Sequence, residues 1–289
     1  MEQKRPLIIA GPCSAESEEQ VLATARALAS TGKVDILRAG VWKPRTKPNT
    51  FEGVGVEALP WLEKARKETG LPLAIEAANT KHVESAMQYD IDIFWIGART
   101  TTNPFSTQEV AEALRGTDKM VYVKNPTSGD VELWCGAVER LLACGVKNIG
   151  LIHRGFAGYG TRDLRNAPMW HLALEMRRRM PELPIICDPS HICGNRAYIK
   201  DISQQAADLN YDGFMIESHI NPDVALSDAK QQLTPQDLSL LLDNIKWREG
   251  ESDSLSYQTT LMSLRDQIDS LDGAILQLLA QRMSLAENI

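Results

Sequence analysis

The chain lacks the features of a membrane or secreted protein. None of its apolar runs approaches the ~20 residues that a helix needs to cross a bilayer. Residues 1–6 are polar and lead straight into a strand-like run, so we expect no signal peptide. Its five cysteines, an odd number in a chain of 289 residues, favour reduced thiols over a disulfide framework. We therefore predict a cytoplasmic protein without a membrane partner.

The chain also lacks an excess of positive charge. Its net charge of -7 argues against bulk binding to nucleic acid. Small anionic substrates are not excluded, because they respond to the local placement of Arg and Lys. A length of 289 residues is enough for one large α/β barrel or for two ordinary domains.

Short apolar runs alternate with helix-like stretches from the first residues on. The runs cover residues 7–10, 35–39, 73–76, 93–97, 120–124, 148–153, 183–187 and 213–216. Apolar runs without alternation are typical of parallel strands buried on both faces. Eight strand–helix pairs in about 245 residues predict a (β/α)8 TIM barrel. The alternative is an open doubly wound sheet, which predicts a glycine-rich phosphate loop after the first strand, and Gly11-Pro12-Cys13-Ser14 is not such a loop.

Reactive or charged side chains stand at the carboxyl ends of these runs. In chain order they are Cys13, Arg38, Glu76, Arg99, Lys124, His153 with Arg154, Asp188 with His191, and Glu217 with His219. A stabilising core does not need such residues at every strand end. In a barrel we expect them to converge on one mouth, where enzymes of this architecture carry their active sites.

Part of this set suits a divalent metal. His191 and Glu217 follow the last two runs, and Asp228 lies in the polar loop beyond them, so a metal needs one more ligand, for which we select Cys13. A thiolate, an imidazole and two carboxylates favour a first-row metal over Ca²⁺ or Mg²⁺ alone. Four ligands with an open position make a Lewis acid for a carbonyl oxygen. The alternative for Cys13 is that it packs as a small buried apolar residue, and the alternative for His191 is that it is a hydrogen-bonded loop histidine.

A second set is cationic. It comprises Arg38, Lys43, Arg45, Arg99, Lys124 and Arg154. Arg binds phosphate and carboxylate through a planar fork, and Lys binds them as a point charge. Six cations around one mouth indicate at least two anionic groups, on more than one substrate. The alternative is that each is a solvated loop residue.

Several ordered motifs carry a resemblance to a known family. They are Gly11-Pro12-Cys13-Ser14, Arg38, Lys43-Pro44-Arg45-Thr46, Gly97-Ala98-Arg99-Thr100-Thr101, Lys124-Asn125 and Asp188-Pro189-Ser190-His191. Together they resemble type I 3-deoxy-D-arabino-heptulosonate 7-phosphate (DAHP) synthase over about residues 7–247. That family is a (β/α)8 barrel, a transferase that condenses phosphoenolpyruvate with erythrose 4-phosphate at the entry to the shikimate pathway and aromatic amino acid biosynthesis.

The resemblance also implies roles for individual residues. The metal (Mn, Fe, Co or Zn) is expected on Cys13, His191, Glu217 and Asp228. Phosphoenolpyruvate contacts are expected from Arg38, Lys43, Arg99, Lys124 and Arg154. Erythrose 4-phosphate contacts are expected from Arg45 and Thr46. Lys43, Cys13 and His191 are expected to be catalytic, and the role of His153 stays open.

The implied reaction has one close alternative and one distant one. The metal orients the aldehyde oxygen, the enol carbon attacks the aldehyde carbon, water adds, and phosphate leaves while Arg99, Lys124 and Arg154 position it. The sister enzyme makes 3-deoxy-D-manno-octulosonate 8-phosphate (KDO8P) from arabinose 5-phosphate, and Lys43-Pro44-Arg45-Thr46 favours DAHP synthase over it. A non-catalytic metal- or phosphoenolpyruvate-binding regulatory module is the third hypothesis. We expect a homo-oligomer, and a redox pair of Cys13 with Cys193 is a weakly supported possibility.

The composition changes after residue 247. We predict a barrel domain over residues 1–247, an acidic linker over 248–258 and an amphipathic helix over 259–289. This helix resembles the first helix of an all-helical chorismate mutase, in which Arg265 and Arg282 would bind chorismate carboxylates. An ordinary amphipathic helix is the alternative. The mutase domain needs two further helices, so we expect a truncated fusion without mutase activity and without inhibition by prephenate or chorismate.

Overall fold

The computed structural model describes residues 5–43, 50–158, 163–248 and 255–286, with side chains of the last segment described from residue 262 on. The chain divides into two compact units. One ends at Arg248, and the other contains the C-terminal helix α11 (Leu255–Ala286). Among the described helices, none has the length and apolar character that a membrane span requires.

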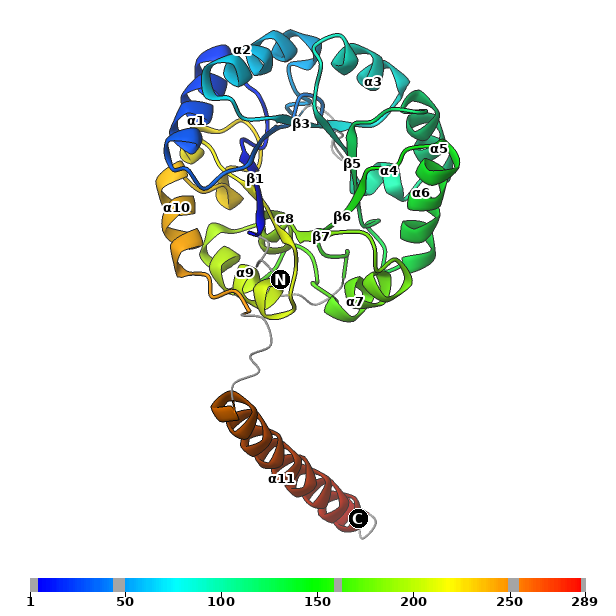
Figure 1. Cartoon of the computed structure of the whole chain (residues 1–289), viewed down its shortest axis with the longest axis vertical. Coiled ribbons are helices and arrows are strands. Elements are labelled where there is room, and N and C mark those ends of the chain that lie inside the picture. The colour runs from blue at the N-terminus through cyan, green and yellow to red at the C-terminus, as the bar shows by residue number, and fades with distance from the viewer. Residues whose placement is uncertain (1–4, 44–49, 159–162, 249–254, 287–289) are drawn as a thin grey trace. The chain divides into compact units, whose positions relative to one another are not determined.

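The first unit is a closed barrel of eight parallel strands, which confirms the predicted (β/α)8 architecture (Figure 1). The strands are β1 (Leu7–Gly11), β2 (Ile36–Ala39), β3 (Leu73–Ala77), β4 (Ile93–Ile96), β5 (Met120–Lys124), β6 (Ile149–His153), β7 (Ile185–Cys187) and β8 (Gly213–Glu217). Each strand pairs with the next along the chain, and β1 pairs with β8 from Leu7↔Gly213 to Gly11↔Glu217. This last pairing places the ends of β1 and β8 side by side.

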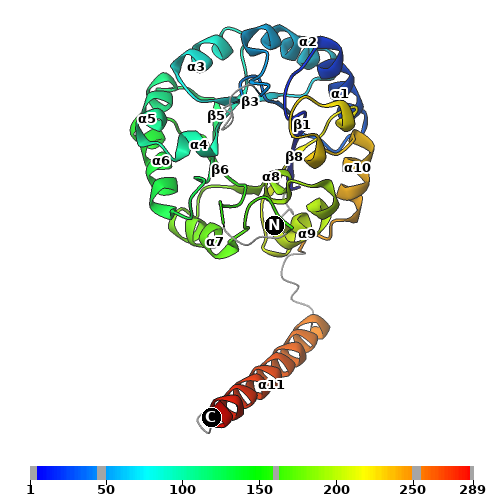
Figure 2. The same ribbon diagram turned by 180° about the vertical axis from the view of Figure 1, so that it is seen from behind.

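Helices surround the barrel, as Figures 1 and 2 show from its two ends. The long ones are α1 (Glu18–Ser30), α2 (Leu59–Thr69), α3 (Thr80–Met87), α5 (Pro104–Ala113), α6 (Val131–Ala143), α7 (Trp170–Arg179), α9 (Ile199–Asp208) and α10 (Pro235–Asn244). Shorter ones are α4 (Ala98–Thr101), α8 (Pro189–Cys193) and the 3-10 turns η1 (Gly55–Ala58), η2 (Arg196–Tyr198), η3 (Pro222–Val224) and η4 (Ala229–Gln231). The short helices α4 and α8 follow strand ends and therefore shape the mouth.

Local capping explains where the helices begin. The Ser17 side chain accepts a hydrogen bond from the Gln20 backbone N–H at the start of α1, and Thr234 accepts one from Asp237 at the start of α10. Asn103 caps α5, with Pro104 at its first position, so this helix begins before Thr107 rather than after it.

The barrel has two apolar layers. The inner layer fills the barrel and consists of Ile9, Ile36, Ala74, Ile93, Trp95, Tyr122, Ile152, Ile186 and Met215. The larger outer layer lies between the sheet and the helices and includes Phe94, Leu151 and Phe214. Because side chains alternate along a strand, residues two positions apart share a layer.

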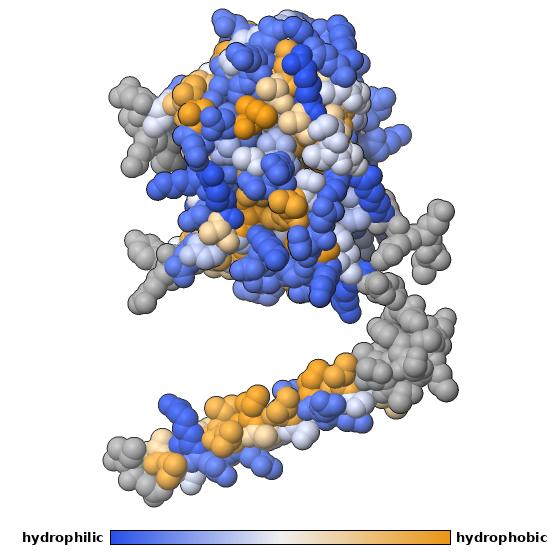
Figure 3. Space-filling model, turned by 90° about the vertical axis from the view of Figure 1, so that its left-hand side faces the viewer, coloured by the Kyte–Doolittle hydropathy of each residue, from blue (hydrophilic) through white to orange (hydrophobic). Residues whose placement is uncertain are grey.

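Helix α11 is continuous over 32 residues. Its apolar residues follow three-four spacing, and Figure 3 shows apolar side chains gathered along it; they include Leu264, Ile268, Leu271, Ile275 and Leu278. The helix begins within the segment 248–258 that we expected to be a linker. Gly273 lies in its interior, at a cost of about 1 kcal/mol relative to Ala.

Candidate metal and anion site

The alternation of side chains delivers six charged residues to the barrel mouth. Each stands two positions after an inner-layer residue of its own strand and so points to the same side. They are Arg38, Glu76, Lys124, Arg154, Asp188 and Glu217, which follow Ile36, Ala74, Tyr122, Ile152, Ile186 and Met215. The inner layer forms the floor, and these residues form the first ring above it.

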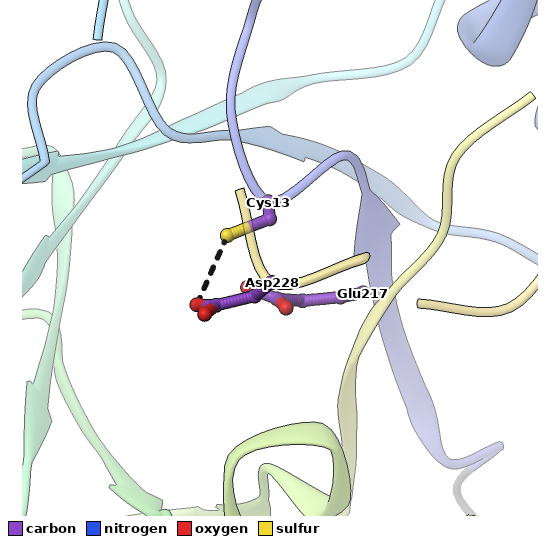
Figure 4. A group of neighbouring side chains, drawn as sticks. All are labelled: Cys13, Glu217 and Asp228. Atoms are coloured by element: carbon purple, nitrogen blue, oxygen red, sulfur yellow. Dashed lines mark hydrogen bonds between the residues drawn. The ribbon is translucent and has the colours of Figure 1, made fainter. Parts of the chain in front are cut away.

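Three of the four predicted metal ligands form a tight group. The Cys13 thiol and one carboxylate oxygen each of Glu217 and Asp228 lie within 4.8 Å of one another (Figure 4). Cys13 follows β1, Glu217 ends β8, and Asp228 lies in the loop after β8. The pairing of β1 with β8 brings the first two together. Cys13 and Glu217 are fully buried.

His191 stands next to this group on α8. Its Nε2 lies 3.8 Å from Glu217 Oε1, while its Nδ1 lies 2.8 Å from Asp188 Oδ2. Asp188 also caps α8, because its Oδ1 accepts a hydrogen bond of 3.0 Å from the His191 backbone N–H. A carboxylate on one ring nitrogen is the usual way to aim the other nitrogen at a metal. Asp188 Oδ2 therefore lies next to one ring nitrogen of His191, while the other ring nitrogen is on the side of Glu217.

The surroundings of Cys13 and Glu217 shift the pKa values of both side chains. Burial, together with the charges of Glu217 and Asp228, raises the pKa of the Cys13 thiol to about 12, against the opposing effect of Lys43. The thiol accordingly donates to Asp228 Oδ2 at 3.4 Å. Burial also acts to raise the pKa of Glu217, but His191, Arg38 and Lys43 outweigh it and hold this pKa well below its usual range. A metal bound at this group would require the Cys13 thiol to lose its proton.

The donor set fits a divalent first-row metal. A thiol and two ionised carboxylates from three distant segments converge in a buried space, with an imidazole at its edge. Two carboxylates held this close repel each other, and a cation between them offsets the repulsion. Mixed sulfur, nitrogen and oxygen ligands match Zn²⁺, Fe²⁺, Co²⁺ or Mn²⁺.

Cations line the cavity beside this group. Among the described lining residues are five cations, Lys43, Arg99, Lys124, Arg154 and Arg165, together with Glu76, His191 and Asp228. Lys124 Nζ lies 2.8 Å from Asp188 Oδ2, and Arg154 Nη1 donates to Asn166 Oδ1 at 3.0 Å. Burial lowers the pKa of Arg154 to about 10, so it stays charged at neutral pH. The cavity therefore suits ligands with several negative charges.

Two residues expected to contact the substrate bind instead to predicted metal ligands. Arg38 is fully buried and does not belong to the described lining of the cavity: it donates to Glu217 Oε1 at 2.9 Å and to the Cys13 carbonyl at 3.1 Å. Lys43 Nζ donates to the same carbonyl at 2.9 Å and lies 3.1 Å from Cys13 Sγ. The predicted Arg45 and Thr46 lie outside the described residues.

The expectation that every charged strand end faces the mouth is wrong for His153. It stands one position after the inner-layer Ile152 and so points to the outer layer. There its ring lies between the Tyr211 hydroxyl, at 2.9 Å, and the Pro168 carbonyl, at 2.7 Å. His219 is also turned away, with Nε2 3.7 Å from Glu16.

The structure leaves two further predictions untested: the redox pair of Cys13 with Cys193, and the role of Arg265 and Arg282. All five cysteines, Cys193 included, are free thiols, so the redox pair with Cys13 stays a prediction. Arg265 and Arg282 lie on α11, in the second unit, and their role stays a prediction as well.

Sequence reasoning missed Arg165 and Gln231. Arg165 lies in the loop after β6, and Gln231 belongs to η4, so neither stands at a strand end. No motif or spacing singles them out. Asp188 stands at a strand end, as predicted. Its place between Lys124 and His191 depends on the short helix α8. Asp188 as the cap and Pro189 as the first residue could have predicted that helix.

The barrel and its mouth define a class of protein: a (β/α)8-barrel enzyme for anionic substrates, with a candidate metal centre at the carboxyl ends of its strands. The chain belongs to the DAHP synthetase I family, whose model matches residues 2–252. This match ends before α11 begins.

Individual relatives agree with this assignment. A phospho-2-dehydro-3-deoxyheptonate aldolase of Thermotoga maritima is 33% identical over 253 residues, which cover 87% of this chain and 71% of the relative. The crystal structure of DAHP synthase from T. maritima aligns with a TM-score of 0.74 and 31% identity, over 82% of this chain and 67% of the other. A 2-dehydro-3-deoxyphosphooctonate aldolase of Geobacter sp. (strain M21) is 28% identical over 263 residues, which cover 84% of this chain and 92% of the relative.

Proposed function

We propose that the protein condenses phosphoenolpyruvate with erythrose 4-phosphate to give DAHP and phosphate, as the first step of aromatic biosynthesis in the cytoplasm. One observation carries this proposal: the metal-type donor group, formed by Cys13, Glu217 and Asp228, adjoins a cavity that is lined by Asp228 and by five cations. One substrate brings a phosphate and a carboxylate and the other a phosphate and an aldehyde. Such a pair of substrates needs both the metal-type donor group and the cations.

In the metal half of the site, the metal would be held by Cys13, His191, Glu217 and Asp228. A divalent ion bound there acts as a Lewis acid toward a carbonyl oxygen. Asp188 lies next to the His191 ring, and Arg38 holds Glu217, so these ligands would need little rearrangement.

The anion half would bind phosphoenolpyruvate. Lys124 and Arg154 hold its charged groups from the ends of β5 and β6, and Arg99 reaches the same cavity from α4. Asp188 holds Lys124 and Asn166 holds Arg154 before a ligand arrives, which lowers the entropic cost of orienting it. Lys43 lies between the two halves, bonded to Cys13 and facing the cavity, and its ammonium can stabilise negative charge that develops on the aldehyde oxygen.

The bond changes follow from this arrangement. The enol carbon of phosphoenolpyruvate attacks the aldehyde carbon, and the aldehyde oxygen becomes a hydroxyl after it takes a proton. Water adds to the carbon that bears the phosphate ester, the carbon–oxygen bond to phosphate breaks, and a ketone remains. The two protons of the water balance the new hydroxyl and the departing phosphate. Arg154 and Lys124 hold the departing phosphate, which they already contact in the bound substrate.

The second aldose hypothesis keeps support from the relatives. The names of the T. maritima and Geobacter relatives refer to a heptonate and an octonate, respectively. Identity is higher for the heptonate relative, and Lys43-Pro44-Arg45-Thr46 favours the same product class. Arabinose 5-phosphate as the aldose, with KDO8P as the product, is therefore the second candidate. Membership of a synthase family disfavours a non-catalytic module.

A phosphoenolpyruvate consumption assay tests the proposal. Purified protein is offered erythrose 4-phosphate or arabinose 5-phosphate, each with added Mn²⁺ and with a chelator. We expect turnover with erythrose 4-phosphate and loss of turnover in the chelator. Faster turnover with arabinose 5-phosphate would replace the aldose assignment, and full activity after metal removal would contradict the metal assignment. Homo-oligomer formation, which we also expect, is measured separately by light scattering.

A further inference from the structure

Arg165 contacts the metal-type donor group although no sequence pattern singled it out. Its Nη1 lies 3.3 Å from Asp228 Oδ1 and donates to Gln231 Oε1 at 2.9 Å. One guanidinium nitrogen therefore meets both a carboxylate of the group and an amide beside it. The Arg165 side chain is 40% exposed and Asp228 is 18% exposed, so the pair lies at the rim of the buried space.

Gln231 extends this contact to the second carboxylate. The side chain is buried, and its Nε2 donates to Glu217 Oε2 at 2.7 Å. An amide has one accepting and one donating end. Because Arg165 can only donate, it holds the Gln231 oxygen toward itself and turns the amide NH₂ toward Glu217.

In both Asp228 and Glu217, one carboxylate oxygen faces the metal-type donor group and the other faces Arg165 or Gln231. Asp228 presents Oδ2 to Cys13 at 3.4 Å and Oδ1 to Arg165. Glu217 presents Oε2 to Gln231, while Oε1 receives Arg38 and lies 3.8 Å from His191 Nε2. Arg165 and Gln231 thus occupy one oxygen of each carboxylate.

The scaffold fixes Arg165 itself. Its backbone N–H donates to the Cys193 carbonyl at 3.2 Å, and its side chain packs on Gly194, where a Cβ would lie 2.6 Å from the Arg165 Cβ. The next residue, Asn166, donates to the His191 carbonyl at 2.6 Å. Arg165 is therefore held against α8, the helix that carries His191.

We propose that Arg165 is a positioning residue, which sets Asp228 directly and Glu217 through Gln231 in the orientations that bind the metal. This inference rests on the metal site of the proposed function. Partners of this kind typically change metal affinity by about 10–100-fold when they are removed.

Electrostatics alone predicts the opposite sign. A guanidinium beside a cation site repels the ion, so its removal should tighten metal binding if Arg165 acted only through its charge. If Arg165 acts by orienting the two carboxylates, its removal weakens binding. The direction of the change separates the two roles.

The test measures the Kd of Mn²⁺ by competition with a fluorescent chelator, without substrates. We expect Arg165→Met to weaken binding by about 10–100-fold and Arg165→Lys, which keeps the charge but not the planar fork, to fall between it and the wild type. Gln231→Leu should also weaken binding, and the double variant should lose less than the two single effects combined, because both act on one network. Arg178→Met, in an exposed pair with Glu175 on α7, is the matched control and should leave Kd unchanged.

Folding is checked by the thermal unfolding of each metal-free variant, which should match that of the Arg178→Met control. An Arg165→Met variant that folds and binds Mn²⁺ as tightly as the wild type, or more tightly, overturns the inference and leaves the proposed function standing. A wild-type protein that binds no divalent ion overturns the proposed function and the inference together.

Discussion

The guanidinium of Arg38 lies 2.9 Å from Glu217 Oε1, and neither side chain is more than 1% exposed. This pair joins the end of β2 to the end of β8, and the Cys13 carbonyl accepts a second hydrogen bond from Arg38. A buried charge is tolerated when a partner compensates it. Arg38 therefore keeps a carboxylate ionised where burial alone would favour its protonated form.

Removal of Arg38 should cost the fold far more than removal of an exposed arginine. Arg38→Leu leaves Glu217 as a buried charge without this partner, so we expect a loss of about 3–5 kcal/mol in the free energy of unfolding. Arg26→Leu removes an ion pair with Glu68 at a similar distance, 2.7 Å, but with the two side chains 60% and 30% exposed. We expect a much smaller loss for that control, because solvent screens an exposed ion pair. Urea unfolding measures both variants, and equal losses would contradict the account.

The buried His153 should make stability depend on pH. Burial, with the nearby Arg154 charge, lowers the pKa of His153 from 6.5 to about 4. Between these values the unfolded chain binds a proton that the folded protein excludes. Stability therefore rises with pH in this window, and the contribution is lost as pH falls from about 6.5 to about 4, by roughly 3 kcal/mol.

The matched variant for this prediction is His153→Gln. Its amide can accept from Tyr211 and donate to Pro168 but does not titrate. Urea unfolding at pH 6.5 and pH 4 should show a smaller loss for the variant than for the wild type, by roughly 3 kcal/mol. If the wild type and the variant lose the same stability, His153 is protonated at pH 4 to the same extent in the folded protein as in the unfolded chain.

Arg154 should contribute to phosphoenolpyruvate binding. A charge-assisted hydrogen bond is worth about 1.5–3 kcal/mol, so Arg154→Met should weaken the Kd of phosphoenolpyruvate by about 10–100-fold. Arg154→Lys should recover part of this loss, because it restores the charge without the fork. Calorimetric titration without an aldose measures the affinity. Arg115→Met, an exposed arginine at the end of the α5 region, is the control; an Arg154→Met variant with unchanged affinity would remove Arg154 from the substrate site.

Much of the barrel could be predicted because its signals are local. The eight apolar runs match β1 to β8 within one or two residues, and Ser17 and Thr234 mark helix starts. The face of each strand end could also be predicted from period two. The same rule, applied to Ile152, would have placed His153 outside the mouth and Arg154 inside it.

The rest depends on tertiary contacts that leave no local signal. Arg165 approaches Asp228 because the loop after β6 packs on Gly194, and a loop path of this kind has no periodicity. The position of Asp228 itself depends on a left-handed backbone conformation, with φ +45°, which a sequence does not show for an Asp. The sequence also does not show whether Arg38, at the end of its strand, faces the cavity or the Glu217 carboxylate.

The most direct test of the central claim is the optical spectrum of the Co²⁺-loaded protein. If Cys13 binds the metal, Co²⁺ should produce a thiolate-to-metal charge-transfer band, because a thiol that binds a metal loses its proton. Cys13→Ala should abolish this band. Cys193→Ala, which removes another buried thiol near the mouth, should keep it. A band that survives in Cys13→Ala, or no band in the wild type at saturating Co²⁺, would contradict the account.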